Sequence, residues 1–231
     1  MVGNRPAAKA RPAQPKRNCL VLLGSLVALL VSFPFLEDVA KPLVLIIPVA
    51  VVFVAAVVAV DAGRINIFRA LFISGSQVSL AVVSLAQREE KAIYWIAVSL
   101  ALLATAFLIL FATYCVLGYV LRSQVITRDQ IYAGICMYLM LGFAFGAVFY
   151  LINTLDPGSF AVSNDLLARS DNPDLMYFSF VTLATLGYGD ITPRTNIARS
   201  LAVVEALAGM LYIAVFMARL VSLHSTSAEN D

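Results

Sequence analysis

Six long apolar segments constrain this chain more than any other feature of its sequence. A helix needs about 20 mostly apolar residues to cross the hydrocarbon core of a bilayer, and these segments are of that order. Charged residues make up only 13% of the 231 residues, whereas soluble domains contain about 25%. We therefore predict an all-α membrane protein. Its six transmembrane helices are expected at 19–36, 42–60, 67–86, 92–121, 130–153 and 197–223.

Lysine and arginine are unequally distributed between the two sides that six spans define. The side that holds both termini carries ten of these residues, and the opposite side carries six. Because positive loops stay inside, both termini are predicted to be cytoplasmic in a multi-pass protein of the plasma or inner membrane. Residues 1–18 are then a disordered basic tail, and 224–231 are a short cytoplasmic tail. A basic tail before an apolar run is also typical of a secretory signal. No small-residue cleavage pattern follows Leu36, so a retained helix is favoured.

The polar sequence TLGYGD at residues 185–190 interrupts the apolar C-terminal part of the chain. Irregular backbone at membrane depth is tolerated only where it is buried in protein or lines a watery cavity. Glycine adopts positive φ without a Cβ penalty. Gly187 and Gly189 alternate with Leu186 and Tyr188, so successive carbonyl groups can point at one axis while the side chains point away. The alternative is an ordinary tight turn, because Gly-Tyr-Gly-Asp is a common loop string.

TLGYGD closely resembles the selectivity filter of potassium channels, in which backbone carbonyls replace the hydration shell of the ion. Over 130–223, the order of helix, acidic loop, short helix at 175–184, filter and helix is similar to the two-helix pore module of that family. The resemblance implies a re-entrant pore helix and filter loop. It also implies a homotetramer in membrane lipid, because one strand cannot ring an ion. No cofactor and no nucleic-acid partner are expected, with K⁺ as the permeant ion. The implied K⁺-coordinating residues are Thr185, Leu186, Gly187 and Tyr188.

The same resemblance assigns residues that support the filter. Gly189 and Asp190 complete the motif. Tyr177 and Phe178 occupy the aromatic-cuff positions of the family and are expected to pack around Tyr188. These contacts are predicted to keep the filter from collapsing.

Two residues depart from the family pattern. Ala184 stands where a second threonine is usual, and Leu186 stands where valine or isoleucine is commoner. Neither change removes a filter carbonyl, but both alter the packing behind it. A non-selective or sodium-conducting cation channel on the same scaffold is therefore an alternative to a potassium-selective channel. A secondary transporter, or a pore subunit of a larger complex, is a further alternative. Transporters often contain internal repeats, and no obvious repeat is present.

The last apolar segment carries a glycine at a notable position. Gly209 lies 19 residues after Asp190, which matches the hinge glycine of the inner helix in potassium channels. The alternative is a small residue that lets two helices approach closely. Residues at helical spacing from Gly209 share one face and are predicted to line the cavity, with an apolar constriction at its last two positions. These cavity-lining residues are Ala206, Met210, Ile213 and Met217.

Glu205 is the one acidic residue inside a predicted span. Intramembrane carboxylates are costly and usually have a partner. Glu205 lies one position off the proposed cavity face, so contact with the pore helix at Ser179 or Thr182 is favoured over contact with ions. Val181 stands where some potassium channels carry a filter-bracing glutamate. We hypothesise that Glu205 supplies this support instead.

The first four helices, within 19–129, are not a conventional voltage sensor. No charged residue lies between Lys91 and Arg122, and one charge gains only about 2.3 kcal/mol per 100 mV, so a sensor needs several. These helices could respond to lipid or tension, bind a small ligand, or brace the pore. No phosphate-binding loop, metal cluster or nucleophile-base pair is present in the sequence, so no enzyme is predicted.

Overall fold

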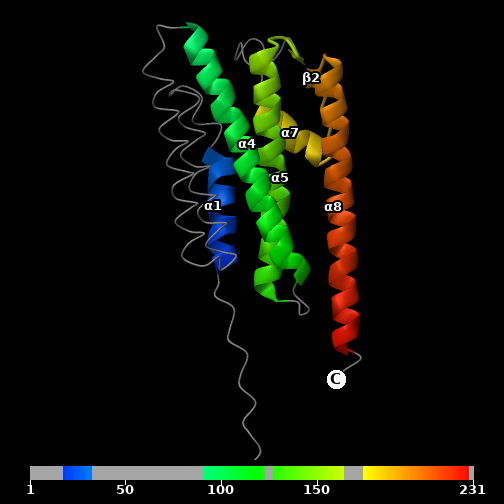
Figure 1. The fold of residues 1–231 in the computed structure, drawn as a ribbon. Coiled ribbons are helices and arrows are strands. Elements are labelled where there is room, and N and C mark those ends of the chain that lie inside the picture. Colours follow the sequence, from blue (N-terminus) through cyan, green and yellow to red (C-terminus); the bar gives the residue numbers. More distant parts are fainter. Residues whose placement is uncertain (1–17, 33–90, 123–126, 164–173, 229–231) are drawn as a thin grey trace, which may run out of the picture.

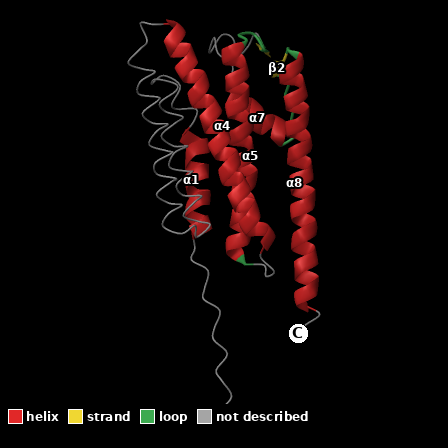
Figure 2. Cartoon of the chain, viewed as in Figure 1, coloured by secondary structure: helices red, strands yellow, loops and turns green. Residues whose placement is uncertain are grey.

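The computed structural model describes residues 18–32, 91–122, 127–163 and 174–228. These residues form helices of different lengths and one short pair of strands (Figure 2). In chain order the elements are α1 (Asn18–Ser32), α4 (Lys91–Arg122), α5 (Arg128–Leu155), β1 (Phe160–Val162), α7 (Leu175–Leu183), β2 (Ile191–Pro193) and α8 (Asn196–Ala228).

Three helices of the described region are long and apolar enough to cross a membrane. They confirm the helices predicted at 92–121, 130–153 and 197–223, and they agree with a membrane protein. Their spanning parts are Ser99–Gly118, Arg128–Leu155 and Asn196–Ser222.

The remaining predicted spans are only partly covered by the structure. Of the predicted span 19–36, the described part includes the apolar helix Cys19–Val31 of α1, and residues 33–36 lie outside the described residues. The segments 42–60 and 67–86 lie outside the described residues, as do residues 1–17 and 229–231 of the two terminal tails. The count of six spans therefore stays a prediction.

α5 is the central helix of the described region (Figure 1). It packs against α1, α4, α7 and α8. The short helix α7 lies between the upper parts of α5 and α8, and it contacts both. α8 is the least covered of the long helices described. Only 11% of its most apolar stretch is buried within the chain, compared with 56% for α5.

The first turn of α5 is fixed by side chains of its own sequence. Thr127 is the N-cap, and its hydroxyl accepts a hydrogen bond from the Gln130 N–H. The Gln130 side chain accepts in return from the Thr127 N–H, which completes a capping box. Asp129 Oδ1 also accepts from the backbone N–H of Cys19 at 3.3 Å. The start of α1 is thereby attached to the start of α5.

Apolar side chains of α1, α4 and α5 form the lower core. Leu22 and Leu26 of α1 are fully buried, together with Val116 of α4 and Met140 of α5. Between helices in lipid, such contacts stabilise through close van der Waals packing and not through removal of apolar surface from water. This core fixes the position of α5, which also contacts α7 and α8.

A second, aromatic core lies at the opposite end of α5. Phe149 is fully buried, and its ring meets those of Phe160 and Phe178 edge to face, with centroids 5.6 and 5.1 Å away. Phe160 belongs to β1, which pairs antiparallel with β2 in the register Phe160 opposite Pro193 and Val162 opposite Ile191. The segment that follows residue 190 is thus anchored to the loop after α5.

Candidate functional site

The TLGYGD segment begins where α7 ends. The Thr185 N–H donates to the carbonyl of Thr182, and the Leu186 N–H donates to the carbonyl of Val181, both at 2.9 Å. The last carbonyls of the helix are therefore satisfied by the first residues of the loop. This arrangement directs the loop away from the C-terminal end of α7.

The backbone of this loop alternates in handedness. φ is 57° at Thr185, 55° at Gly187 and 78° at Gly189, so every second residue of the loop has positive φ. Leu186 and Tyr188 between them have ordinary negative φ. Alternation of this kind turns successive carbonyls to the same side. The alternation expected from the sequence is present, with Thr185 adopting it despite its Cβ.

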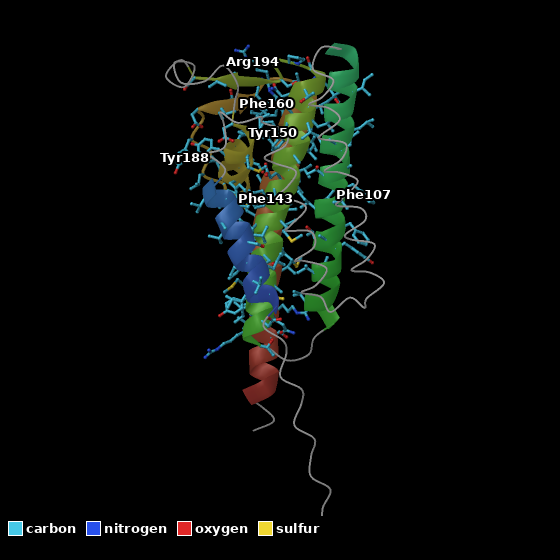
Figure 3. All side chains as sticks on the ribbon, turned by 90° about the vertical axis from the view of Figure 1, so that its left-hand side faces the viewer. Phe107, Phe143, Tyr150, Phe160, Tyr188 and Arg194 are labelled. Atoms are coloured by element: carbon cyan, nitrogen blue, oxygen red, sulfur yellow. The ribbon has the colours of Figure 1, made fainter. Side chains whose placement is uncertain are left out.

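The side chains of the loop stand clear of the chain that carries them. Leu186 is 57% exposed and Tyr188 is 66% exposed. Figure 3 shows Tyr188 at the edge of the molecule, on the opposite side from Phe107 of α4. Large apolar side chains at membrane depth need protein or lipid around them, and within one chain Leu186 and Tyr188 are largely uncovered.

Asp190 fastens the end of the loop at three points. Its Oδ2 accepts a hydrogen bond from the Tyr177 hydroxyl at 2.7 Å, and its Oδ1 accepts from the N–H of Ile191 at 3.0 Å. Its backbone carbonyl accepts from the N–H of Ser163 at 2.9 Å. Asp174 caps the other end of α7 by accepting from the N–H groups of Met176 and Tyr177. Asp190 therefore holds the end of the loop, and Asp174 fixes the opposite end of the helix from which the loop starts.

The two aromatic residues predicted to surround Tyr188 have different environments. Tyr177 is exposed and bonded to Asp190. Phe178 is only 6% exposed, because its ring packs against Phe149 and Phe160. Within its own chain the Phe178 ring therefore attaches α7 to α5 and β1. The packing of Tyr177 and Phe178 around Tyr188 stays a prediction.

The Tyr177–Asp190 hydrogen bond is expected to contribute measurable stability. Desolvation, followed by the hydrogen bond to Asp190, raises the pKa of Tyr177 from 10 to about 12. The neutral hydroxyl is the donor, so the contribution is present below pH 10 and is lost as pH rises through about 12. In a thermal-unfolding double-mutant cycle, Tyr177→Phe and Asp190→Ala should couple by about 1 kcal/mol.

A matched cycle controls for this prediction. Tyr114 lies on α4 and is 72% exposed. Tyr114→Phe combined with Asp190→Ala should give additive changes in stability. Additivity in the Tyr177 cycle as well would show that the hydrogen bond contributes nothing.

Glu205 of α8 is fully buried and contacts α7, the short helix with which the sequence predicted a contact. Its Oε1 lies 2.5 Å from the hydroxyl oxygen of Ser179. Of the two predicted partners, the contact is with Ser179 and not with Thr182. The Ser179 hydroxyl also donates to the carbonyl of Gly142 at 2.7 Å. One serine of α7 thus links α8 to α5.

Gly209 marks the closest approach of α8 to the end of α7. A Cβ at this position would overlap the carbonyl oxygen of Leu183 and lie 3.0 Å from Leu183 Cδ1. The same carbonyl accepts a hydrogen bond from the Tyr138 hydroxyl of α5 at 3.2 Å. The geometry supports the small-residue interpretation of Gly209, and Gly209 lies within the continuous helix α8.

The predicted cavity face of α8 is largely uncovered within the chain. Met210, Ile213 and Met217 are each about half exposed, and Ala206 is partly buried. Their lining of a cavity stays a prediction.

Several supporting residues were not predicted from the sequence. Tyr138 and Gly142 of α5 contact the α7 region directly. A Cβ on Gly142 would lie 2.7 Å from the Phe180 ring, and one on Gly146 would lie 2.5 Å from the Met176 sulfur. The small-xxx-small spacing of these two glycines in an apolar helix is the signal that could have identified the α7-facing side.

Comparison with known proteins places this C-terminal region in a family. A protein-family model described as "Ion channel" matches residues 137–225. Protein LctB of Bacillus caldotenax is 33% identical over 101 residues, which are 42% of this chain and 73% of that protein. The chain belongs to the ion channel family. Among solved structures, none matches it significantly.

Two plant relatives align over shorter stretches of this ion channel family member. "Two pore potassium channel c" of Oryza sativa subsp. japonica is 35% identical over 88 residues, or 37% of this chain. "Two-pore potassium channel 4" of Arabidopsis thaliana is 39% identical over 57 residues, or 25% of this chain. The alignments cover 18% and 20% of the lengths of these two proteins.

Proposed function

We propose that four copies of this chain form a potassium-selective channel, in which the 185–190 loops surround a common axis. The observation that carries the proposal is the alternating backbone of Thr185, Gly187 and Gly189. Four such loops would present rings of carbonyl oxygens from residues 185–188 to a dehydrated K⁺ ion. Potassium-channel names among the relatives agree with this ion.

The uncovered surfaces favour assembly into a tetramer. Leu186 and Tyr188 are exposed, and most apolar side chains of α8 are exposed in one chain. Neighbouring copies would cover the inner part of α8 and the filter side chains, and lipid would cover the rest. In this arrangement Met210, Ile213 and Met217 line the cavity below the filter, with Ile213 and Met217 as its apolar constriction.

The orientation of α7 also suits a cation. The negative end of its helix dipole lies at its C-terminus, beside Leu183, where the loop begins. In a four-fold assembly, four such ends would point toward the cavity and favour a cation there. With both termini in the cytoplasm, the filter loop enters from outside, and Asp190 lies near the outer mouth.

The main alternative is a cation channel that does not discriminate against sodium. Ala184 and Leu186 alter the packing behind the filter. However, the backbone at these positions is fixed by the carbonyls of α7, because the Ala184 N–H donates to Phe180 and the Leu186 N–H donates to Val181. This support does not depend on the two departing side chains, so potassium selectivity is favoured.

Ion flux into liposomes tests the proposal. Purified full-length protein should carry K⁺ down its gradient at least about tenfold faster than Na⁺, since 1.4 kcal/mol of differential stabilisation gives that ratio. Empty liposomes are the control. Equal K⁺ and Na⁺ fluxes would favour the non-selective channel, and a saturable turnover without unitary currents would favour a transporter.

A further inference from the structure

The Ser179 hydroxyl makes two short oxygen–oxygen contacts but carries only one hydrogen. The Ser179 oxygen lies 2.7 Å from the Gly142 carbonyl oxygen and 2.5 Å from Glu205 Oε1. Both separations are within the range of O–H···O hydrogen bonds. A serine hydroxyl has a single hydrogen, a carbonyl can only accept, and an ionised carboxylate can only accept. Two hydrogen bonds therefore need a second hydrogen.

We propose that Glu205 is a neutral carboxylic acid that donates its proton to the Ser179 hydroxyl, which in turn donates to the Gly142 carbonyl. The resulting relay runs from α8 through α7 to α5. The Glu205 carboxyl hydrogen lies between Glu205 and Ser179, and the Ser179 hydroxyl hydrogen lies between Ser179 and Gly142. Each short oxygen–oxygen contact then contains one hydrogen.

The surroundings of the carboxyl group agree with the neutral form. Glu205 is fully buried, and its Oε2 has no hydrogen-bond partner within the described residues. Among those residues, Ser179 is its hydrogen-bond partner, and no Lys, Arg or His forms an ion pair with it. An unpaired buried charge is far more costly than a neutral acid with one unsatisfied carbonyl oxygen.

The ionisable side chain that faces Glu205 does not compete for the Ser179 hydroxyl. Tyr138 of α5 faces it, but the Tyr138 hydroxyl donates to the Leu183 carbonyl. The Tyr138 hydroxyl therefore already has an acceptor, and the proton shared with Ser179 belongs to Glu205.

In this account Glu205 is a positioning residue for the pore helix. Ser179 lies on α7 six residues before Thr185, so the relay fixes the helix from which the filter loop starts. The expected effect on ion flux rests on the proposed function. The protonation state itself does not, and it is measured separately.

Infrared spectroscopy tests the proton directly. Wild-type protein in lipid nanodiscs at neutral pH should show the C=O stretch of a buried carboxylic acid. This band should be absent from Glu205→Gln and should persist in the control Asp156→Asn, which removes an exposed carboxylate at the end of α5. In Ser179→Ala, the band should move to higher wavenumber, because the acid loses its acceptor. A wild-type spectrum without a Glu205-dependent band would overturn the proposal, whatever the flux results.

Conservative rescue tests the relay. A glutamine amide can donate to the Ser179 oxygen, so Glu205→Gln should retain K⁺ flux within about twofold of wild type. Its melting temperature should stay close to that of wild type. Glu205→Leu has a similar size but no donor, and it should reduce flux about tenfold, as expected for the loss of about 1.4 kcal/mol. If Glu205→Gln behaved like Glu205→Leu, the donor role would be excluded. If wild type and all variants lacked flux while the band was present, the channel proposal would fail and the neutral acid would stand.

Discussion

Gly187→Ala is expected to reduce potassium flux below about 1% of the wild-type rate. Gly187 has φ of 55°, and no side chain or backbone lies within 4 Å of an added Cβ in the chain. The loss of flux is therefore expected from the cost of positive φ at alanine and not from a steric clash. A non-glycine residue in left-handed backbone costs about 1 to 2 kcal/mol, so four copies at one level of a filter cost about 4 to 8 kcal/mol. Since each 1.36 kcal/mol is tenfold, this cost is enough to depopulate the conducting filter.

Liposome flux with a matched glycine control checks this prediction. Gly118→Ala is the same chemical change on α4, where an added Cβ also meets open space and the backbone is helical. It should leave flux unchanged. Thr185 already adopts positive φ with a side chain, so the backbone tolerates this strain at one position. Wild-type flux in Gly187→Ala would mean that the loop does not form the conduction path.

Gly209→Ala is expected to destabilise the folded protein by about 1 to 3 kcal/mol, as overpacking generally does. The added Cβ would overlap the backbone carbonyl of Leu183, which cannot rotate away as a flexible side chain can. α8 would have to move off the end of α7. That movement would also strain the hydrogen bond from Tyr138 to the same carbonyl. Thermal unfolding of the purified protein measures the loss.

The control for this prediction is Gly24→Ala on α1, where nothing lies within 4 Å of an added Cβ. Its melting temperature should equal or slightly exceed that of wild type, because alanine favours helix more than glycine does. The outcome also separates the two interpretations of Gly209. A hinge predicts unchanged stability with reduced opening, whereas close helix approach predicts lowered stability. Unchanged stability in Gly209→Ala would refute the close-approach account.

The sequence predicts the helices well where apolar length decides them. The segments 92–121, 130–153 and 197–223 are helical within a few residues, except that α8 continues to Ala228. The short helix predicted at 175–184 also forms, ending at Leu183. The contact between Glu205 and Ser179 could be predicted because a buried acid needs a partner.

Tertiary contacts of ordinary residue types could not be predicted in the same way. Phe178 is buried against Phe149 and Phe160, and only the pairing of β1 with β2 brings Phe160 there. Tyr138 resembles any other aromatic residue of an apolar helix until α7 is placed beside it. Such contacts depend on the relative position of helices, which a periodic pattern does not encode.

The most direct measurement is an electron cryomicroscopy map of the full-length protein purified in potassium salt within lipid nanodiscs. The account predicts a particle of four chains, with the four TLGYGD loops around one axis and density for ions between their carbonyl groups. It predicts in addition that Met210, Ile213 and Met217 face the cavity beneath. A stable single-chain particle, or loops that face lipid away from any shared axis, would contradict it.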